Sequence, residues 1–190
     1  MSIKHCIVKI PKTVKVMYSE DTKLLYLKGL VRKKTIILTN KLNFSISSNY
    51  IKITPYNFYL PSKNVKKKTK SYLGLICSII KQSVLEVSNI LCKKLKFVGV
   101  GFKVFIHSIF NKIILQLKIG FSHTVFLKLP NNIKVHCFKS NSKIYLFGTN
   151  YRKLLQITSF IRKLKIPEPY KGKGILYELE NIKLKEGKKI

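Results

Sequence analysis

Residues 10–29, IPKTVKVMYSEDTKLLYLKG, align without a gap with residues 129–148, LPNNIKVHCFKSNSKIYLFG. The identical pairs are Pro11/Pro130, Lys15/Lys134, Val16/Val135, Tyr26/Tyr145, Leu27/Leu146 and Gly29/Gly148. In both copies apolar residues alternate on either side of a polar cluster, which is typical of a strand, a turn and a second strand. An internal repeat of this kind predicts two similar small domains, with Val16 and Val135 in equivalent core positions.

The first copy is followed by further strand patterns. Val31 to Leu38 reads as a strand, and Phe44 to Ile53 reads as a hairpin that turns at Ser47, Ser48 and Asn49. Ser62 to Lys70 holds five Lys and no acid and is interpreted as a basic loop, either solvated or in contact with phosphates. Apolar residues three and four apart predict a helix at about 71–90. The first domain is expected at residues 1–93.

The second domain is expected at residues 94–170. Strands are predicted around Leu95 to Ile106 and Lys112 to Ile119, ahead of the repeat copy. The domain ends in a helix that Asn150 caps, because Asn accepts hydrogen bonds from the first free backbone N–H groups. The residues predicted to face the core on this helix are Tyr151, Leu154, Leu155, Thr158 and Ile161. The expected fold class is α+β: two homologous domains, each an antiparallel β-sheet covered by an α-helix.

The charge balance points to a polyanionic partner. The chain carries 38 Lys and Arg against 7 Asp and Glu, a net charge of +31. Such a charge repels itself in the compact state and attracts nucleic acid or an anionic membrane. With 46% apolar residues the chain can still form buried cores, so wholesale disorder is excluded.

The composition also carries a genomic signal. Lys, Ile, Asn, Phe and Tyr fill 93 of the 190 positions, and their codons are rich in A and T. That bias is typical of organelle genomes. Together with the lack of a presequence pattern at Met1 to Pro11, it predicts synthesis inside a mitochondrion, with a plastid-type organelle as the alternative.

Other classes of site lack their sequence signatures. No uncharged stretch reaches the length of a membrane span. No metal site is predicted, and the four Cys are interpreted as buried apolar residues in a reducing compartment rather than as disulfides or zinc ligands. These are Cys6, Cys77, Cys92 and Cys137. Val98 to Gly101 lacks the third Gly of a dinucleotide fingerprint and is interpreted as a Gly-containing strand or turn.

The C-terminal sequence after Pro167 is predicted to contact RNA. Two prolines end the second helix, and residues 171–190 are expected to form a basic tail outside the core. Gly172 and Gly174 let a backbone approach phosphates between Lys171 and Lys173, and the Tyr170 ring can stack on a base or sugar. The alternative from the residues alone is a solvated basic terminus.

The same stretch carries a family resemblance. PEPYKGKGI at 167–175, with Tyr177, resembles the C-terminal signature of the large-subunit ribosomal protein six family. The likeness extends to FVGVGFK at 97–103, IGFSH at 119–123 and KEGKK at 185–189. The resemblance implies two homologous sheet-plus-helix domains, no catalysis and no cofactor. It also implies binding to large-subunit rRNA near the sarcin-ricin loop, with neighbouring ribosomal proteins as partners and translation factors nearby.

The resemblance implies a set of RNA-facing residues. They are Arg162, Tyr170, Lys171, Gly172, Lys173 and Gly174, together with Lys103 and His123. From the residues alone, packing at a sheet edge is favoured over RNA contact for His123. Two departures from the family pattern bear on this set. Leu176 stands where the family usually has Arg, and Thr124 stands where Pro commonly follows the Gly-Phe-Ser-His stretch.

Two rival functions remain at this stage. A peripheral protein of anionic membranes would need a helix with a broad exposed apolar face, and neither predicted helix has that asymmetry. An RNA-modifying enzyme would need catalytic acids or a metal cluster. The four His have no carboxylate neighbours in sequence and four of the seven acids lie in the last 23 residues, so no catalytic residues are predicted.

Overall fold

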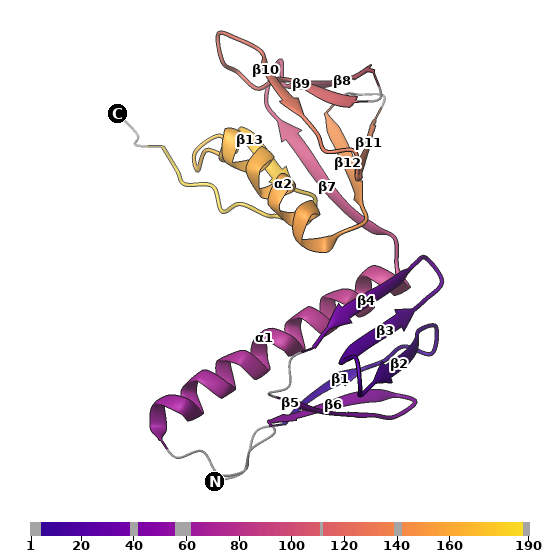
Figure 1. Ribbon diagram of the computed structural model, residues 1–190. Helices are drawn as coiled ribbons and strands as arrows, with labels where there is room; N and C mark the ends of the chain where they lie inside the picture. The colour runs from indigo at the N-terminus through magenta and orange to yellow at the C-terminus, as the bar shows by residue number, and fades with distance from the viewer. Residues whose placement is uncertain (1–4, 39–41, 56–61, 111, 139–141, 188–190) are drawn as a thin grey trace. The chain divides into compact units, whose positions relative to one another are not determined.

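The computed structural model describes residues 5–38, 42–55, 62–110, 112–138 and 142–187. The chain divides into two compact units, Met1–Ile90 and Leu91–Ile190 (Figure 1). The division falls before the expected boundary at residue 93 because a long strand of the second unit already starts at Leu91.

Unit 1 contains two small sheets and one helix. Its elements are β1 (Cys6–Lys9), β2 (Lys15–Ser19), β3 (Leu24–Lys28), β4 (Lys33–Ile37), β5 (Leu42–Ile46), β6 (Tyr50–Pro55) and α1 (Lys63–Ser88). The strands form antiparallel sheets in the orders β1-β6-β5 and β2-β3-β4. Side chains that alternate along the strands, such as Leu25 and Leu27, are fully buried with the apolar face of α1 in one core.

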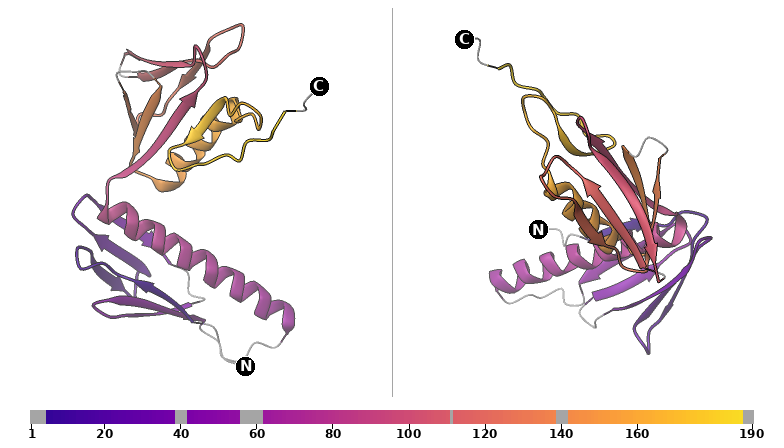
Figure 2. Two further views of the ribbon diagram at one scale, coloured as in Figure 1. Left: turned by 180° about the vertical axis from the view of Figure 1, so that it is seen from behind. Right: turned by 90° about the horizontal axis from the view of Figure 1, so that it is seen from above.

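Unit 2 repeats this plan and adds one strand. Its elements are β7 (Leu91–Val98), β8 (Lys103–Ile109), β9 (Lys112–Lys118), β10 (Val125–Lys128), β11 (Ile133–Cys137), β12 (Lys143–Gly148), α2 (Tyr151–Leu164) and β13 (Gly174–Tyr177). The sheet orders are β10-β9-β8 and β11-β12-β7-β13. The α+β prediction of two small domains built of antiparallel strands and a helix is confirmed, although the strands of each unit form two sheets instead of one (Figure 2).

The two units correspond strand by strand in chain order. The order β1-β6-β5 matches β7-β12-β11, and the order β2-β3-β4 matches β8-β9-β10. In each unit the helix follows the sixth strand. The residue pairing agrees as well, since Val16 opposite Leu27 corresponds to Val104 opposite Leu117. Such agreement of topology and register supports homologous units.

This correspondence corrects the alignment from which the repeat was inferred. Residues 10–29 form the β2–β3 hairpin, whereas residues 129–148 form β11–β12, whose counterpart in unit 1 is β5–β6. Val16 therefore matches Val104, and Val135, which lies opposite Leu146, does not occupy the position of Val16. The expected equivalence of Val16 and Val135 is wrong.

The two hairpins resemble each other because they meet the same physical demands. Leu25 and Leu27 are fully buried, as are Ile144 and Leu146 in the other hairpin. Each hairpin also ends in a glycine beside a helix: a Cβ atom on Gly29 would lie 2.5 Å from the Val87 carbonyl oxygen, and one on Gly148 would lie 3.2 Å from the Leu154 side chain. Similar packing has selected similar residues at positions that are not homologous.

The predicted basic loop at Ser62 to Lys70 is wrong, because these residues start a helix. The Ser62 side chain accepts a hydrogen bond from the Val65 backbone N–H at 3.3 Å, and α1 runs from Lys63 to Ser88. Lys has a high helix propensity, so a capped run of Lys can extend a helix whose apolar pattern starts later, at Leu73. The Phe44 to Ile53 hairpin is confirmed as β5 and β6.

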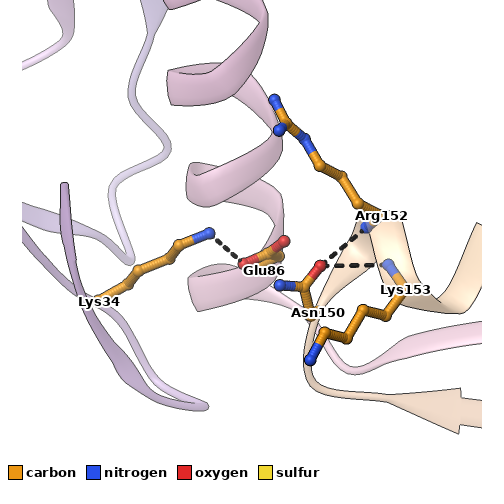
Figure 3. Close-up of polar contacts among 5 residues, drawn as sticks. All are labelled: Lys34, Glu86, Asn150, Arg152 and Lys153. Atoms are coloured by element: carbon orange, nitrogen blue, oxygen red, sulfur yellow. Dashed lines mark hydrogen bonds and ion pairs between the residues drawn. The ribbon is translucent and has the colours of Figure 1, made fainter.

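The second helix agrees with its prediction. The Asn150 side chain accepts hydrogen bonds from the backbone N–H groups of Arg152 and Lys153, at 3.0 and 3.2 Å (Figure 3). Leu154, Thr158 and Ile161 are fully buried on its core face.

The C-terminal sequence does not form the expected tail outside the core. Gly174–Tyr177 is a strand, β13, that pairs with β7 at the sheet edge, with Gly174 opposite Val98 and Tyr177 opposite Leu95. Ile175 is fully buried and Leu176 is 7% exposed. Sequence reasoning gave weight to the two flanking Lys and missed that the four-residue run Gly-Ile-Leu-Tyr is apolar enough to join the sheet.

The interpretation of the cysteines is wrong for one pair. Cys6 of β1 and Cys77 of α1 form a disulfide, because the helix packs over that strand and brings their Cα atoms to 6.5 Å. Cys92 and Cys137 are half-buried and are not joined by a disulfide. Burial raises the pKa of both thiols, which keeps them protonated and poorly reactive.

A partly buried ion pair joins α1 to the β2-β3-β4 sheet of unit 1. Lys34 Nζ lies 2.5 Å from Glu86 Oε2, and Glu86 is only 4% exposed (Figure 3). A carboxylate at that depth is stable only when paired, so Lys34 neutralises it.

The first prediction concerns β13. Replacing Ile175 with Ala should destabilise unit 2 by about 2–5 kcal/mol, because the substitution leaves a cavity beneath a fully buried side chain. Leu179→Ala is the matched control, since Leu179 lies close in sequence and is 92% exposed. Urea unfolding of the full chain, followed by hydrogen exchange of the β7 amides, measures both. Equal losses of unfolding free energy in the two variants would show that β13 does not belong to the core.

Candidate nucleic-acid interface

Three turns meet at one end of unit 2. The first follows β7, the second joins β9 to β10, and the third precedes β13. The Phe102 ring packs beside both Gly99 and Gly120, which links the first two turns. Lys165, at the end of α2, holds its ammonium 5.1 Å from the centre of the Phe121 ring. Because Gly174 pairs with Val98, the third turn is anchored to the end of β7.

The third turn, residues 168–173, is closed by its own backbone. The Glu168 N–H donates to the Lys173 carbonyl and the Gly172 N–H donates to the Glu168 carbonyl, both at 2.9 Å. The side chains of Tyr170, Lys171 and Lys173 are exposed, Tyr170 by 54%. The turn therefore presents one aromatic ring and two cations to solvent on a fixed backbone.

The two glycines of this turn have structural roles. Gly172 has φ +68°, a left-handed conformation that suits glycine, and a Cβ there would lie 3.3 Å from Leu184. Gly174 is buried, and a Cβ would lie 2.5 Å from the Pro167 Cα atom. Both were predicted to give an RNA backbone close approach. In the structure their lack of a side chain is used to close the turn and to pack it on Pro167.

The residues after β13 brace the turn from behind. The Lys185 N–H donates to the Pro169 carbonyl at 2.9 Å, so the chain passes back along the turn. Lys94 of β7 forms an ion pair with Glu178 at 3.2 Å, and Lys96 donates to the Glu178 carbonyl at 2.7 Å. The side-chain hydrogen bond to Glu178 raises the pKa of Lys94. The acids near the C-terminus thus hold the chain against β7.

Arg162 takes part in the same bracing. Its guanidinium forms two hydrogen bonds with the Glu180 carboxylate, Nε to Oε2 at 3.0 Å and Nη2 to Oε1. The Tyr177 ring centre lies 5.7 Å from the guanidinium carbon. The hydrogen bond to Glu180 raises the pKa of Arg162, and the guanidinium holds the pKa of the Glu180 carboxyl below its ordinary value. Arg162 was predicted to face RNA, and its side chain is committed to this internal pair.

Lys103 and His123 lie at the three-turn end of unit 2. Lys103 is the exposed first residue of β8 and lies opposite Lys118. His123 is exposed in the turn between β9 and β10, where its ring stacks on Phe121 with 5.6 Å between centres and 7° between planes. The structure therefore brings these two residues to the end of the unit that carries the 168–173 turn.

Sequence reasoning missed several aromatic and cationic side chains at the same end of unit 2. Phe121 is 42% exposed and contacts both His123 and Lys165, and Lys118 lies 5.9 Å from the centre of the Phe105 ring. Phe121 could have been found from the Gly-Phe-Ser-His stretch, because an aromatic residue in a polar turn is exposed. Nothing in the sequence pairs Lys165 with it, since that contact depends on where α2 ends.

The comparison with known proteins covers nearly the whole chain. A family profile described as ribosomal protein L6 matches residues 98–178. The large ribosomal subunit protein uL6m of Reclinomonas americana is 37% identical over 188 residues, which cover 96% of this chain and 95% of that protein. The chain belongs to the ribosomal protein L6 family.

Bacterial members of the family are similar over the same length. The large ribosomal subunit protein uL6 of Shewanella pealeana is 33% identical over 182 residues, covering 96% of this chain and 95% of the relative. That of Mycoplasma genitalium is 35% identical over 176 residues, covering 92% and 89%. The resemblance seen in the C-terminal signature is confirmed, and it extends through unit 1. The L6 family is structural and non-enzymatic.

Two other kinds of site have no candidate in the described part of the chain. No cluster of three or more His, Cys, Asp or Glu could hold a metal ion there. No helix within the described ranges has the length and apolar character to cross a membrane.

The second prediction concerns pH and the Arg162–Glu180 pair. Because folding lowers the pKa of Glu180 from its ordinary 4.5, the pair stabilises unit 2 fully above that value. The contribution is lost as pH falls through the lowered pKa. Wild type should therefore exceed Glu180→Gln in unfolding free energy at neutral pH, and the difference should shrink on acidification. Urea unfolding of both proteins across this range measures it; a difference independent of pH would contradict the assignment.

Proposed function

We propose that this chain is a structural component of the large subunit of a mitochondrial ribosome. In this proposal unit 2 binds large-subunit rRNA near the sarcin-ricin loop, through the 168–173 turn and the neighbouring turn that carries Phe121 and His123. The main observation in support of RNA binding is the closed turn, which exposes Tyr170, Lys171 and Lys173 together. Lys ammonium groups contact phosphates, and a flat ring stacks on a base or sugar.

The charge of the chain supports RNA as the partner. The net charge of +31 is not neutralised internally, because the chain has only seven acids. Three of these acids, Glu86, Glu178 and Glu180, are already used to join elements of the fold. Seven acids cannot neutralise 38 cations, so most of the positive charge stays uncompensated and its repulsion falls when RNA binds.

Two observations support the mitochondrial assignment. The relative from Reclinomonas americana bears the name uL6m, and the A- and T-rich composition fits synthesis within the organelle. A plastid-type organelle is the alternative. Immunodetection in gradient-purified mitochondrial and plastid ribosomes distinguishes the two, and a signal confined to plastid ribosomes would overturn the assignment.

The third prediction tests the turn. Replacing both Lys171 and Lys173 with Glu should strongly reduce incorporation into the large subunit, since two attractions to phosphate become repulsions. Both side chains are exposed, so the unfolding free energy of unit 2 should change little. Quantitative mass spectrometry of the sedimented large-subunit particle measures incorporation.

The control changes Lys188 and Lys189 to Glu, which alters net charge equally. These two residues lie outside the described part of the chain. If the control pair proves as damaging as Lys171 and Lys173, the C-terminal residues act as an undifferentiated basic arm and the turn is not the site. Gly172→Val is a poorer test than the charge changes, because its positive φ makes any side chain there strain the turn itself.

The fourth prediction separates the ribosomal from the membrane assignment. A chain bound to rRNA should sediment with the large-subunit particle in detergent and leave it at high salt. The logarithm of its affinity for the isolated RNA should fall linearly with the logarithm of salt concentration, by about 0.9 for each phosphate contacted in a duplex region. Release by detergent alone, or an affinity independent of salt, would overturn the proposal.

A further inference from the structure

The N-terminal part of α1 extends beyond the core that the rest of the helix covers. Its first buried side chain is Leu73, so residues 63–72 supply no buried residue. In α2 the fourth residue, Leu154, is already fully buried. Figures 1 and 2 show these first turns of α1 projecting past the strands of unit 1. The extension is thus a feature of unit 1 without a counterpart in unit 2.

The side chains of this extension form a row of cations. Lys63, Lys66, Lys67 and Lys70 are all exposed, and their spacing of three and four residues puts them on one helix face. The row spans about 10 Å along the helix axis, at about 1.5 Å for each residue. The sequence has no acid between Asp21 and Glu86, so no carboxylate of the helix itself faces the row.

Repulsion among these lysines lowers the stability of the helix in the isolated protein. Like charges four residues apart destabilise a helix, and the segment supplies little burial in return, since Tyr72 at its end is only partly buried against the core. The backbone at its start is already capped by the Ser62 side chain. The lysine side chains are the charged groups that the extension offers to a ligand.

The chemistry of the row favours nucleic acid over a lipid surface. A membrane-bound helix needs a broad apolar face opposite its cations, and the only large apolar residue among positions 63–71 is Val65. Four ammonium groups along about 10 Å suit a partner that carries negative charges at a regular short spacing, as a phosphate backbone does.

We propose that the lysine row of the α1 extension is a second RNA-binding surface, located in unit 1, which contacts successive phosphates of large-subunit rRNA. This inference rests on the proposed ribosomal function and assigns unit 1 a direct part in it. It is independent of the 168–173 turn, which belongs to unit 2.

The test uses the full chain and in vitro transcribed large-subunit rRNA, with affinity measured by filter binding over a series of KCl concentrations. In the row variant Lys63, Lys66, Lys67 and Lys70 are all changed to Gln, which has similar helix propensity. The matched control changes four exposed lysines of unit 1 that lie outside the extension, on strands and a turn. These are Lys9, Lys12, Lys33 and Lys52.

The row variant should lose at least about tenfold in affinity at low salt, and its log-log salt slope should become shallower by about 2 to 3, as expected for that many lost phosphate contacts. The control should retain most of the affinity and slope. Changing the same four residues to Arg should restore both, because Arg keeps the charge. Hydrogen exchange of the core amides of unit 1 should be the same in all variants.

Equal losses in the row variant and the control would overturn the inference, since only total charge would then matter. A row variant that binds like wild type, while Lys171/Lys173→Glu weakens binding, would also overturn it and leave the proposed function standing. Salt-independent binding by the wild type would instead overturn the proposed function itself.

Discussion

Burial of alternating apolar side chains beneath one helix holds each unit together, because a chain with 38 cations and seven acids has little electrostatic attraction to use internally. Ion pairs occur where single contacts must be fixed. Lys34–Glu86 ties α1 to its sheet, and Arg162–Glu180 together with Lys94–Glu178 ties the C-terminal segment to unit 2. Many of the other cations in the described part of the chain are exposed, where their mutual repulsion is weak and where a polyanion can reach them.

The fold class could be predicted from the sequence, but the correspondence between its halves could not. Alternation in residues 10–29 and 129–148 correctly indicates hairpins, because period-two burial leaves a direct trace in the residues. The same alternation does not show that the two hairpins are homologous. The β2–β3 and β11–β12 hairpins share a buried pair of apolar residues and a terminal glycine beside a helix, so their sequences agree without equivalent positions. Only strand order and register, which are long-range properties, identify β8–β9 as the true match of β2–β3.

The errors at α1 and β13 have a common physical origin. Lys-rich runs at Ser62 to Lys70 and after Tyr170 were interpreted through their charge, as a loop and a tail. Charge alone does not select a backbone conformation, however. A serine cap and good helix propensity make the first segment helical. Burial of Ile175 and Leu176 makes the second a strand of the sheet. The disulfide between Cys6 and Cys77 was equally invisible, because a separation of 71 residues says nothing about which strand lies under which helix.

The candidate site shows how one sequence signature can serve fold and binding together. Of the residues that the family resemblance implied, Gly172 and Gly174 close and pack the turn, and Arg162 braces it through Glu180. Tyr170, Lys171 and Lys173 remain as the groups that face outward. These roles depend on one another. A flexible tail would lose conformational entropy each time it met RNA, whereas a turn already fixed by its glycines and its ion pair loses less. In the proposed function, the glycines and the ion pair would therefore strengthen RNA binding by holding Tyr170, Lys171 and Lys173 in place.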